Sequence, residues 1–162
     1  MHSKIVWEKN KKTGYVAVAA CITANARNFT IRAAQKNYDN FIYADTDSIH
    51  CICGPDDIVG APEDPVKFCH WKYETCWDEA VFVRQKTYIE HVTHDNREPI
   101  DPYYNIKCAG MGKNAQQTLN EWLENGTKTI EDFKSGLLVP GSLKAKRIDG
   151  GVVLVSNDFV IK

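Results

Sequence analysis

The sequence has almost no net charge, no long apolar stretch, no internal repeat and no low-complexity segment. Its 162 residues include 20 Lys and Arg against 21 Asp and Glu, a net charge of −1, which argues against the basic surface of a dedicated nucleic-acid binder. No signal peptide or membrane-spanning stretch is apparent, so we expect a protein of a reducing cytoplasm. With 43% hydrophobic and 25% charged residues, the composition is typical of a globular domain.

Six cysteines are present, but no two of them form a C-x-x-C pair. Closely spaced cysteine pairs are typical of structural zinc sites, and the chain does not resemble a short disulfide-rich scaffold. We therefore expect free thiols, with a small zinc protein as an alternative. The residues that a zinc site would use are Cys51, Cys53, Cys69, His70, Cys76, His91 and His94.

The low net charge is an average over unlike segments. Residues 1–44 carry seven bases and two acids, residues 45–83 carry two bases and nine acids, and residues 84–162 carry eleven bases and ten acids. An acidic middle between basic or mixed ends suits a cation site surrounded by surfaces for a polyanion. A solvated acidic face is the alternative from charge alone.

The first part of the chain predicts a long helix, strands and a loop. In residues 16–38, apolar residues recur at steps of three and four, as on one buried face of a helix. Residues 41–53 are rich in Ile, Tyr and Cys and predict strands on which this helix packs, and residues 54–65 predict a surface loop. The expected buried face of the helix consists of Ala19, Ile22, Ala26, Phe29 and Ala33.

The rest of the chain predicts a mixture of helices and strands. Up to Gly110, a plausible boundary, the patterns predict a helix over 65–81, a strand over 81–93, a turn-like segment over 94–102 and a strand over 103–108. Beyond it they predict a helix over 116–125 capped by Gly126, a helix start at Thr129 with Asp132, and strands over 152–155 and 159–161.

Two aspartates lie two residues apart within a strand-like segment. Asp45 and Asp47 are flanked by apolar strand formers, where buried like charges need a cation or must protonate. In extended structure residues two apart point to the same side, so both carboxylates would converge on a hard cation such as Mg²⁺. A polar hairpin turn, in which these side chains only bond the backbone, is the alternative.

A second polar group follows about forty residues later. Arg84-Gln85-Lys86-Thr87-Tyr88 lies inside a strand-like run, where alternation would place Lys86 and Tyr88 on one face. An ammonium and a phenol so placed can hold a phosphate and a sugar or base of a nucleic acid. A surface lysine beside a cross-strand aromatic residue is the alternative.

In combination, these segments resemble the protein-primed branch of family B DNA polymerases, the replicases of bacteriophages and related mobile elements. Residues 43–50, YADTDSIH, resemble the motif C hairpin, and Lys86 with Tyr88 resembles the K-x-Y motif at the primer terminus. The resemblance runs from about Gly14 to Lys162 and keeps the order of all blocks. The other blocks are Ile22-Thr23-Ala24, Ala26-Arg27, Ala33-Ala34-Gln35, Lys107-Cys108-Ala109-Gly110-Met111 and the terminal GGVVLV.

The resemblance implies an α+β fold with two parts. Residues 1–110 would be the C-terminal part of a polymerase palm, with the long helix packed on antiparallel strands, and residues 111–162 a small thumb with a β-hairpin. The implied partners are a DNA primer-template, deoxynucleoside triphosphates, a terminal protein primer and the remainder of the polymerase, with no membrane. The implied location is the cytoplasm of a bacterial host.

The resemblance also implies roles for individual residues. Asp47 would be the direct ligand and Asp45 the supporting carboxylate for two Mg²⁺ or Mn²⁺ ions. Lys86 and Tyr88, with Arg84 beside them, would hold the primer strand. Tyr43 and Thr46 would shape the hairpin, with Ser48, and face the primer. Phosphate contacts in the thumb would come from Lys144, Lys146 and Arg147, and more weakly from Lys162, although the residues alone equally predict a solvated loop there.

The sequence also departs from the family pattern. It contains no D-x-x-S-L-Y-P segment (motif A, with the other metal-binding Asp), no K-x-x-x-N-S-x-Y-G fingers motif and no exonuclease carboxylates. Ala44 stands where the family has Cys or Gly, and the basic segment before Gly150 lacks the family's prolines. Because metal catalysis needs its ligands together, we expect no DNA synthesis by these residues alone. The alternative function is a non-catalytic DNA-binding or interaction module from a decayed replicase gene.

Overall fold

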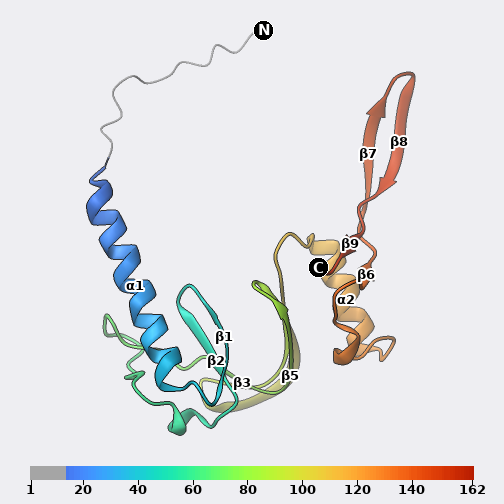
Figure 1. Ribbon diagram of the computed structural model, residues 1–162. Helices are drawn as coiled ribbons and strands as arrows, with labels where there is room; N and C mark the ends of the chain where they lie inside the picture. The colour runs from blue at the N-terminus through green and yellow to red at the C-terminus, as the bar shows by residue number, and fades with distance from the viewer. Residues whose placement is uncertain (1–13) are drawn as a thin grey trace. The chain divides into compact units, whose positions relative to one another are not determined.

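The computed structural model describes residues 14–162, which form two units (Figure 1). The first unit comprises the described residues up to Ala61, and the second comprises Pro62–Lys162. Across the described residues there are two α-helices and several small antiparallel sheets, which confirms the α+β class. The boundary expected near Gly110 stays a prediction.

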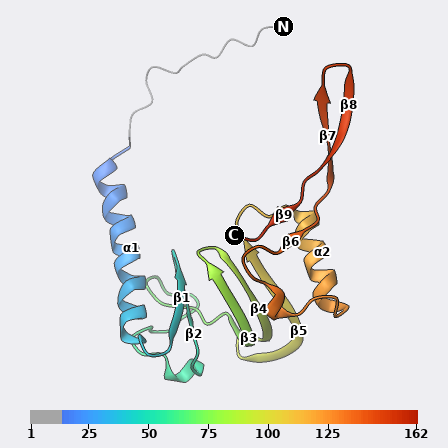
Figure 2. The same ribbon diagram turned by 45° about the vertical axis from the view of Figure 1, so that its right-hand side comes forward.

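The first unit is a long helix beside a β-hairpin. Helix α1 spans Val16–Lys36, β1 spans Phe41–Asp45 and β2 spans Ser48–Cys51, so the helix and strands predicted from the apolar pattern are confirmed. The helix contacts both strands (Figure 2), and a short 3-10 helix, η1 at Pro55–Asp57, interrupts the loop that follows.

The apolar face predicted for α1 is mostly exposed. Of its five residues only Ala33 is buried, at 1% exposure, whereas Ile22 is 65% and Phe29 is 37% exposed. The other buried residue of the helix is a threonine, Thr30. The prediction of a continuous buried stripe was therefore wrong for this unit, because the hairpin covers only the C-terminal part of the helix.

The second unit is built on a three-stranded antiparallel sheet in the order β3-β4-β5. Strand β3 spans Thr75–Arg84, β4 spans Thr87–Asp95 and β5 spans Glu98–Cys108. The helix predicted over residues 65–81 is wrong. Residues 65–74 contain no helix, and β3 pairs with β4 along its length. The hydrogen bonds between these strands stabilise the extended form more than the helical spacing of apolar residues favours a helix, because the segment is short and rich in aromatic and β-branched residues.

Two further expectations for this sheet need correction. The single strand predicted over 81–93 is broken by a two-residue turn at Gln85 and Lys86. The turn-like segment predicted over 94–102 is mostly strand, with the turn confined to Asn96 and Arg97, both of which have positive φ. The strand predicted over 103–108 is confirmed as the second half of β5.

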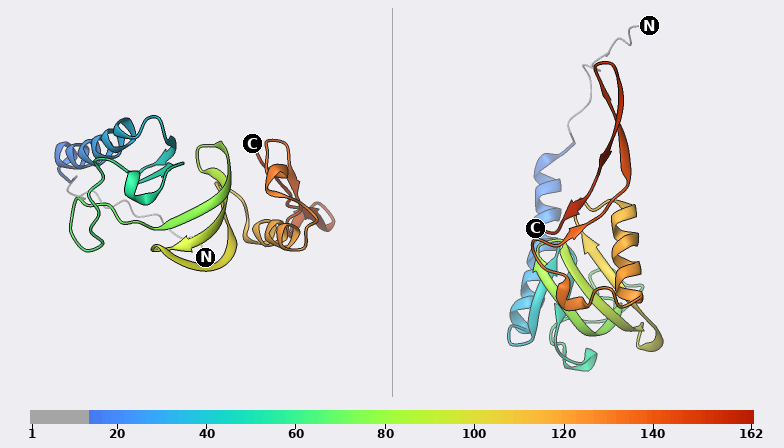
Figure 3. Two further views of the ribbon diagram at one scale, coloured as in Figure 1. Left: turned by 90° about the horizontal axis from the view of Figure 1, so that it is seen from below. Right: turned by 90° about the vertical axis from the view of Figure 1, so that its right-hand side faces the viewer.

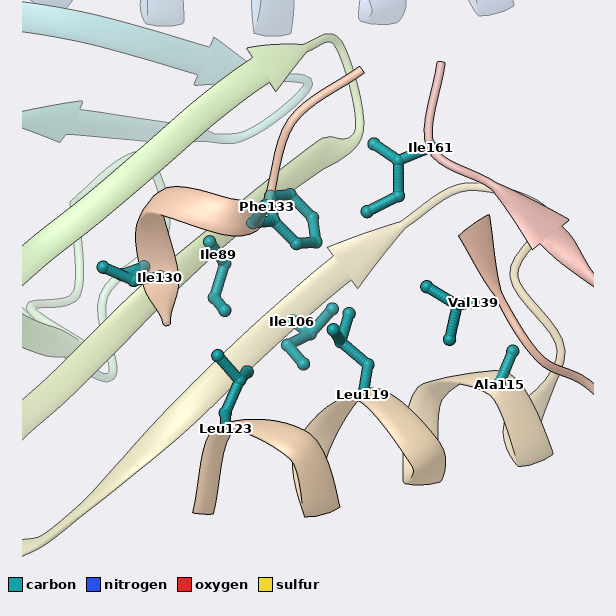
Figure 4. Close-up of a cluster of buried hydrophobic side chains, with 9 residues drawn as sticks. All are labelled: Ile89, Ile106, Ala115, Leu119, Leu123, Ile130, Phe133, Val139 and Ile161. Atoms are coloured by element: carbon teal, nitrogen blue, oxygen red, sulfur yellow. The ribbon is translucent and has the colours of Figure 1, made fainter. Parts of the chain in front are cut away.

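Helix α2, Lys113–Glu124, closes the core of the second unit. It begins three residues before the predicted start and ends at Glu124, and Gly126, two residues further on with a φ of +73°, confirms the predicted cap. The 3-10 helix η2 spans Ile130–Asp132, and the predicted cap is present at its start, where the side chains of Thr129 and Asp132 each bond the backbone of the other. Figure 4 shows the buried cluster where the sheet, α2 and η2 meet. Its members are Ile89, Ile106, Ala115, Leu119, Leu123, Ile130, Phe133, Val139 and Ile161.

Four short strands complete the second unit (Figure 3). Strand β6, Leu138–Val139, pairs with β9, Phe159–Val160, and β7, Leu143–Ile148, pairs with β8, Gly151–Ser156. The strands predicted over 152–155 and 159–161 therefore exist but pair with earlier strands. Within the described range, neither helix is long and apolar enough to cross a membrane.

Candidate functional site

The two predicted metal ligands lie at the tip of the β1–β2 hairpin. Asp45 is the last residue of β1, Thr46 and Asp47 form the turn, and Ser48 opens β2 opposite Asp45. The hairpin form implied by the resemblance is thus present. The alternation argument was wrong, because Asp47 lies in a turn, where the period of two does not apply. The expectation of two buried anions was also wrong, since Asp47 is exposed and Asp45 only partly buried.

Asp45 shapes the turn through its own carboxylate. Its Oδ1 accepts a hydrogen bond from the backbone N–H of Thr46 at 2.7 Å and another from the Thr46 hydroxyl at 3.2 Å. This is the local bonding that the hairpin-turn alternative predicts. The same bonds also suit a carboxylate that supports a metal ligand, because they hold one oxygen of Asp45 and so fix the orientation of its carboxylate.

A threonine of α1 holds the same turn from the helix side. The Thr30 hydroxyl lies 3.1 Å from the carbonyl oxygen of Thr46 and 3.3 Å from that of Ala26 one helical turn earlier. Thr30 is 7% exposed. The sequence analysis missed this residue, although a threonine within an otherwise apolar helical face is the signal that could have found it.

A second polar side chain anchors the loop that follows the hairpin. Asn37, just past α1, donates through Nδ2 to the carbonyl oxygens of Ala33 at 2.8 Å and Val59 at 2.9 Å, and its Oδ1 accepts from the N–H of Val59 at 2.8 Å. It is 5% exposed. The interior of the first unit is therefore organised by side-chain hydrogen bonds to backbone groups.

The donor chemistry of the hairpin tip fits a hard divalent cation in part. Carboxylate oxygens are the ligands that Mg²⁺ and Mn²⁺ prefer, and the exposed Asp47 carboxylate has no protein partner within residues 14–162. No group of three or more His, Cys, Asp or Glu residues in that range could hold a metal ion. The tip thus supplies two carboxylates and leaves further ligands to water, substrate or other protein groups.

Aromatic contacts stiffen the hairpin beside the tip. Tyr43 on β1 is directly opposite His50 on β2, with ring centroids 5.3 Å apart. Cross-strand pairs of this kind are a main source of stability in a hairpin. Tyr43 therefore braces β1 two residues before Asp45, and its role at a primer stays a prediction.

The second predicted group lies at the β3–β4 turn of the second unit. Arg84 ends β3, and Lys86 is the second residue of the turn, with a φ of +57°. Both are exposed, whereas Tyr88 on β4 is 9% exposed and stacks on Phe82 at 5.2 Å. The expectation that Lys86 and Tyr88 share one face of a strand was wrong, because Lys86 lies in the turn.

The Lys86 turn is tied to the end of the sheet. The backbone N–H of Ala109 donates to the carbonyl oxygen of Lys86 at 2.8 Å, and Thr87 pairs with Cys108. A non-glycine residue with a left-handed backbone is strained. Lys86 is therefore presented by a turn that is bonded to the end of β5.

The basic residues expected in the thumb lie on β7 rather than in a loop. All six residues of β7 and all six of β8 are exposed. Lys144 pairs with Val155 and Lys146 with Val153, whereas Arg147 pairs with Val152. Because side chains alternate along a strand, the two lysines share one face of the ribbon and Arg147 lies on the other. Lys162 is exposed at the chain end.

The cysteines are free thiols in the described residues. Burial raises the pKa of Cys51 and of Cys53, with a further contribution from the neighbouring thiol to Cys51 and from Asp57 to Cys53. Burial also raises the pKa of Cys108. A raised pKa disfavours the thiolate that binds zinc. Since the described residues bring no three of the candidate zinc ligands together, the zinc alternative gains no support.

Comparisons with known proteins point to one family. No protein-family model matches the sequence. The chain is 35% identical to the DNA polymerase of Bacillus phage phi29, over 96% of this chain and 27% of that enzyme, and 32% identical to the DNA polymerase of Streptococcus phage Cp-1, over 96% of this chain and 25% of that enzyme. It spans about a quarter of the length of these curated relatives.

Solved structures agree with the sequence comparison. The phi29 DNA polymerase in complex with primer-template DNA and incoming nucleotides matches with a TM-score of 0.70 at 36% identity, over 91% of this chain and 26% of that one. An orthorhombic crystal form of the same polymerase matches with a TM-score of 0.71 at 35% identity, over 98% and 28%. This chain is homologous to phi29-type protein-primed DNA polymerases over about 96% of its length, and it covers about 27% of those enzymes.

Proposed function

We propose that this chain is the C-terminal palm and thumb segment of a protein-primed DNA polymerase, with the palm over residues 1–110 and the thumb over residues 111–162. The observation that carries the proposal is the β1–β2 hairpin, whose tip presents the exposed Asp47 beside the turn-bonded Asp45. The homology to phi29-type enzymes supports it, as does the match to a polymerase structure with DNA and nucleotides bound.

Asp47 and Asp45 have different tasks in this proposal. Two divalent cations, when bound, stabilise both the attacking and the leaving oxygen of a phosphoryl displacement. Asp47 is the direct ligand, because its carboxylate is exposed and unbonded in the described residues. Asp45 supports it with one oxygen held by the turn. The motif A aspartate of the family completes the set from the remainder of the polymerase.

The other candidate residues bind the nucleic acid. Lys86 and Tyr88, with Arg84 at the end of β3, hold the primer strand by charge and by contact with sugar or base. Tyr43 and Thr46 shape the hairpin beside the primer terminus. The exposed bases of the β7–β8 ribbon contact backbone phosphates, and their residues are Lys144, Lys146 and Arg147. The terminal protein and deoxynucleoside triphosphates are the further partners, in the cytoplasm of the bacterial host.

A chimera tests the proposal directly. This chain would replace the homologous quarter of the phi29 DNA polymerase, and primer extension would be measured with Mg²⁺ or Mn²⁺. We expect synthesis that Asp47→Asn abolishes, whereas Asp45→Asn lowers it by roughly 10- to 100-fold, as is usual for residues that support a metal ligand. Asp57→Asn, in the exposed 3-10 helix after the hairpin, is the matched control and should leave synthesis unchanged. A folded chimera that extends primers equally well with Asp47→Asn would contradict the proposal.

The chain by itself gives a complementary test. We expect these 162 residues to bind primer-template DNA in a salt-sensitive way but not to synthesise DNA. Synthesis by the chain alone, lost with Asp47→Asn, would show that the missing motifs are dispensable. DNA binding with no metal dependence, and no response of the chimera to Asp45 or Asp47 substitution, would instead identify a non-catalytic DNA-binding module.

A further inference from the structure

The turn that carries Asp47 is bonded by a side chain of the helix beside it. Asp47 is joined to Thr46 by a planar peptide unit, which contains the Thr46 carbonyl and the Asp47 N–H. The Thr30 hydroxyl lies 3.1 Å from that carbonyl oxygen. A bond to this oxygen restrains the peptide plane, and the peptide plane sets the direction in which the Asp47 side chain leaves the turn.

Thr30 is well suited to act as a fixed donor. It lies in the C-terminal third of α1 at 7% exposure, and a β-branched side chain on a helix has few rotamers. A hydroxyl has a single proton to donate, and of its two acceptors the Thr46 carbonyl is nearer, at 3.1 Å against 3.3 Å for that of Ala26. Most threonines on helices bond only their own helix, so a contact 16 residues along the chain is distinctive.

The two bonds to Thr46 act on opposite sides of the residue. Asp45 accepts from the N–H of Thr46, and Thr30 donates to its carbonyl. Thr46 is therefore held at both backbone groups, one from the strand and one from the helix. Asp47 has no comparable bond of its own in the described residues, so its placement depends on Thr46.

We propose that Thr30 is a positioning residue that orients Asp47 for metal binding through the carbonyl of Thr46. This inference rests on the proposed function, since it assumes that a divalent cation binds at the hairpin tip. It goes further by naming a residue that touches neither the metal nor the DNA. The role belongs to the hydroxyl and not to the methyl group of Thr30.

The test uses the full chain and Mn²⁺ alone. Binding at the tip is followed by paramagnetic broadening of the Asp45–Ser48 backbone NMR signals, and the Thr30–Thr46 bond is followed in the absence of metal by the carbonyl carbon shift of Thr46. Thr30→Val removes the hydroxyl with little change in volume. We expect a shifted Thr46 carbonyl signal and an increase of about threefold to tenfold in the Mn²⁺ concentration for half-broadening, the range expected for one lost hydrogen bond.

Two matched variants separate a positioning role from a packing role. Thr30→Ser keeps the hydroxyl and should retain the wild-type carbonyl shift and Mn²⁺ response. Thr23→Val removes an exposed hydroxyl of the same helix that, within residues 14–162, bonds only the Ala19 carbonyl, at 3.0 Å, and should also behave like wild type. If Thr30→Ser loses the response or the hairpin fold to the same extent as Thr30→Val, packing is the cause and the inference is overturned.

The outcomes also separate this inference from the proposed function. If Mn²⁺ broadens the hairpin signals in wild type, Asp47→Asn abolishes the effect and Thr30→Val leaves it unchanged, the proposed function stands and the role of Thr30 is overturned. If Mn²⁺ leaves the hairpin signals of the wild-type chain unaffected, the role of Thr30 is overturned, and if Asp47→Asn binds as well as wild type, both are overturned.

Discussion

The two units of this protein differ in how many apolar side chains they bury. In the first unit the buried residues of α1 and its cap are Thr30, Ala33 and Asn37, two of which are polar. In the second unit the nine-residue buried cluster is entirely apolar, and two buried polar residues of β4, Thr87 and Glu90, lie outside it. Apolar burial is non-directional, whereas a hydrogen bond fixes distance and angle.

This difference bears on how each candidate site is held. The carboxylate turn belongs to the unit whose interior is a set of directed hydrogen bonds, so a single polar substitution should disturb its geometry. The Lys86 turn belongs to the unit with the apolar core and is presented by a three-stranded sheet. The second site should therefore tolerate polar changes that damage the first.

The largest effect is expected in the apolar core of the second unit. Phe133 is 1% exposed, and truncation of such a residue to alanine typically costs about 3–5 kcal/mol. We expect Phe133→Ala to lower the free energy of unfolding by that amount in urea titrations. Phe68→Ala removes a phenyl ring that is 95% exposed and should have little effect. Equal stability of the two variants would show that the cluster does not dominate this unit.

A smaller effect is expected from the polar interior of the first unit. Asn37→Ala removes the bonds to Ala33 and Val59, and the backbone groups left unpaired cost about 1–3 kcal/mol. We expect faster hydrogen exchange at the Val59 amide and lower stability. Asn28→Ala, at an exposed position of α1, is the control. Unchanged exchange at Val59 would mean that polar contacts do not organise this unit.

The Lys86 turn should show a trade between stability and binding. Because Lys86 has a φ of +57°, replacement by glycine should raise the free energy of unfolding by about 1 kcal/mol while weakening primer-template binding. Asn96→Gly, at a similar φ of +47° in the β4–β5 turn, should leave binding unchanged. A Lys86→Gly variant that binds DNA as wild type does would remove Lys86 from the primer site.

The smallest effect concerns pH and the cap of η2. The backbone N–H of Thr129 donates to Asp132 and lowers the pKa of that carboxyl below its ordinary value of 3.8. A lowered pKa in the folded state stabilises the fold above 3.8, and this contribution is lost as the pH falls through the folded value. Asp132→Asn should flatten the acid limb of a stability-against-pH curve, and Glu131→Gln should not. An NMR titration of Asp132 at its ordinary pKa would contradict this.

Local patterns in the sequence predicted the elements whose signals are local. The apolar spacing of α1, the strand formers around the Asp45–Asp47 turn, the cap at Gly126 and the pairing of Thr129 with Asp132 all led to correct elements. The prediction of a helix over residues 65–81 was wrong because a strand is stabilised by its partner, and pairing with β4 is not visible in β3 alone.

For the candidate site, the sequence suggested a family, but its predicted geometry was wrong. The residues flanking Asp45 and Asp47 were enough to suggest a family that the comparisons then supported. Their predicted geometry assumed an extended strand, and the turn changed both the direction and the exposure of Asp47. The same assumption misplaced Lys86 on a strand face.

The sequence by itself determined the chemical groups, their order along the chain and the low net charge that conceals an acidic middle. Tertiary structure decided which backbone groups of the turn and loop are hydrogen-bonded and which side chains bond them. The bond from Thr30 to Thr46 spans 16 residues and that from Asn37 to Val59 spans 22, and neither partner can be read from the residues around the donor. The physical reason is that propensity and periodicity act within a few residues, whereas the orientation of a turn depends on donors that only the folded chain brings beside it.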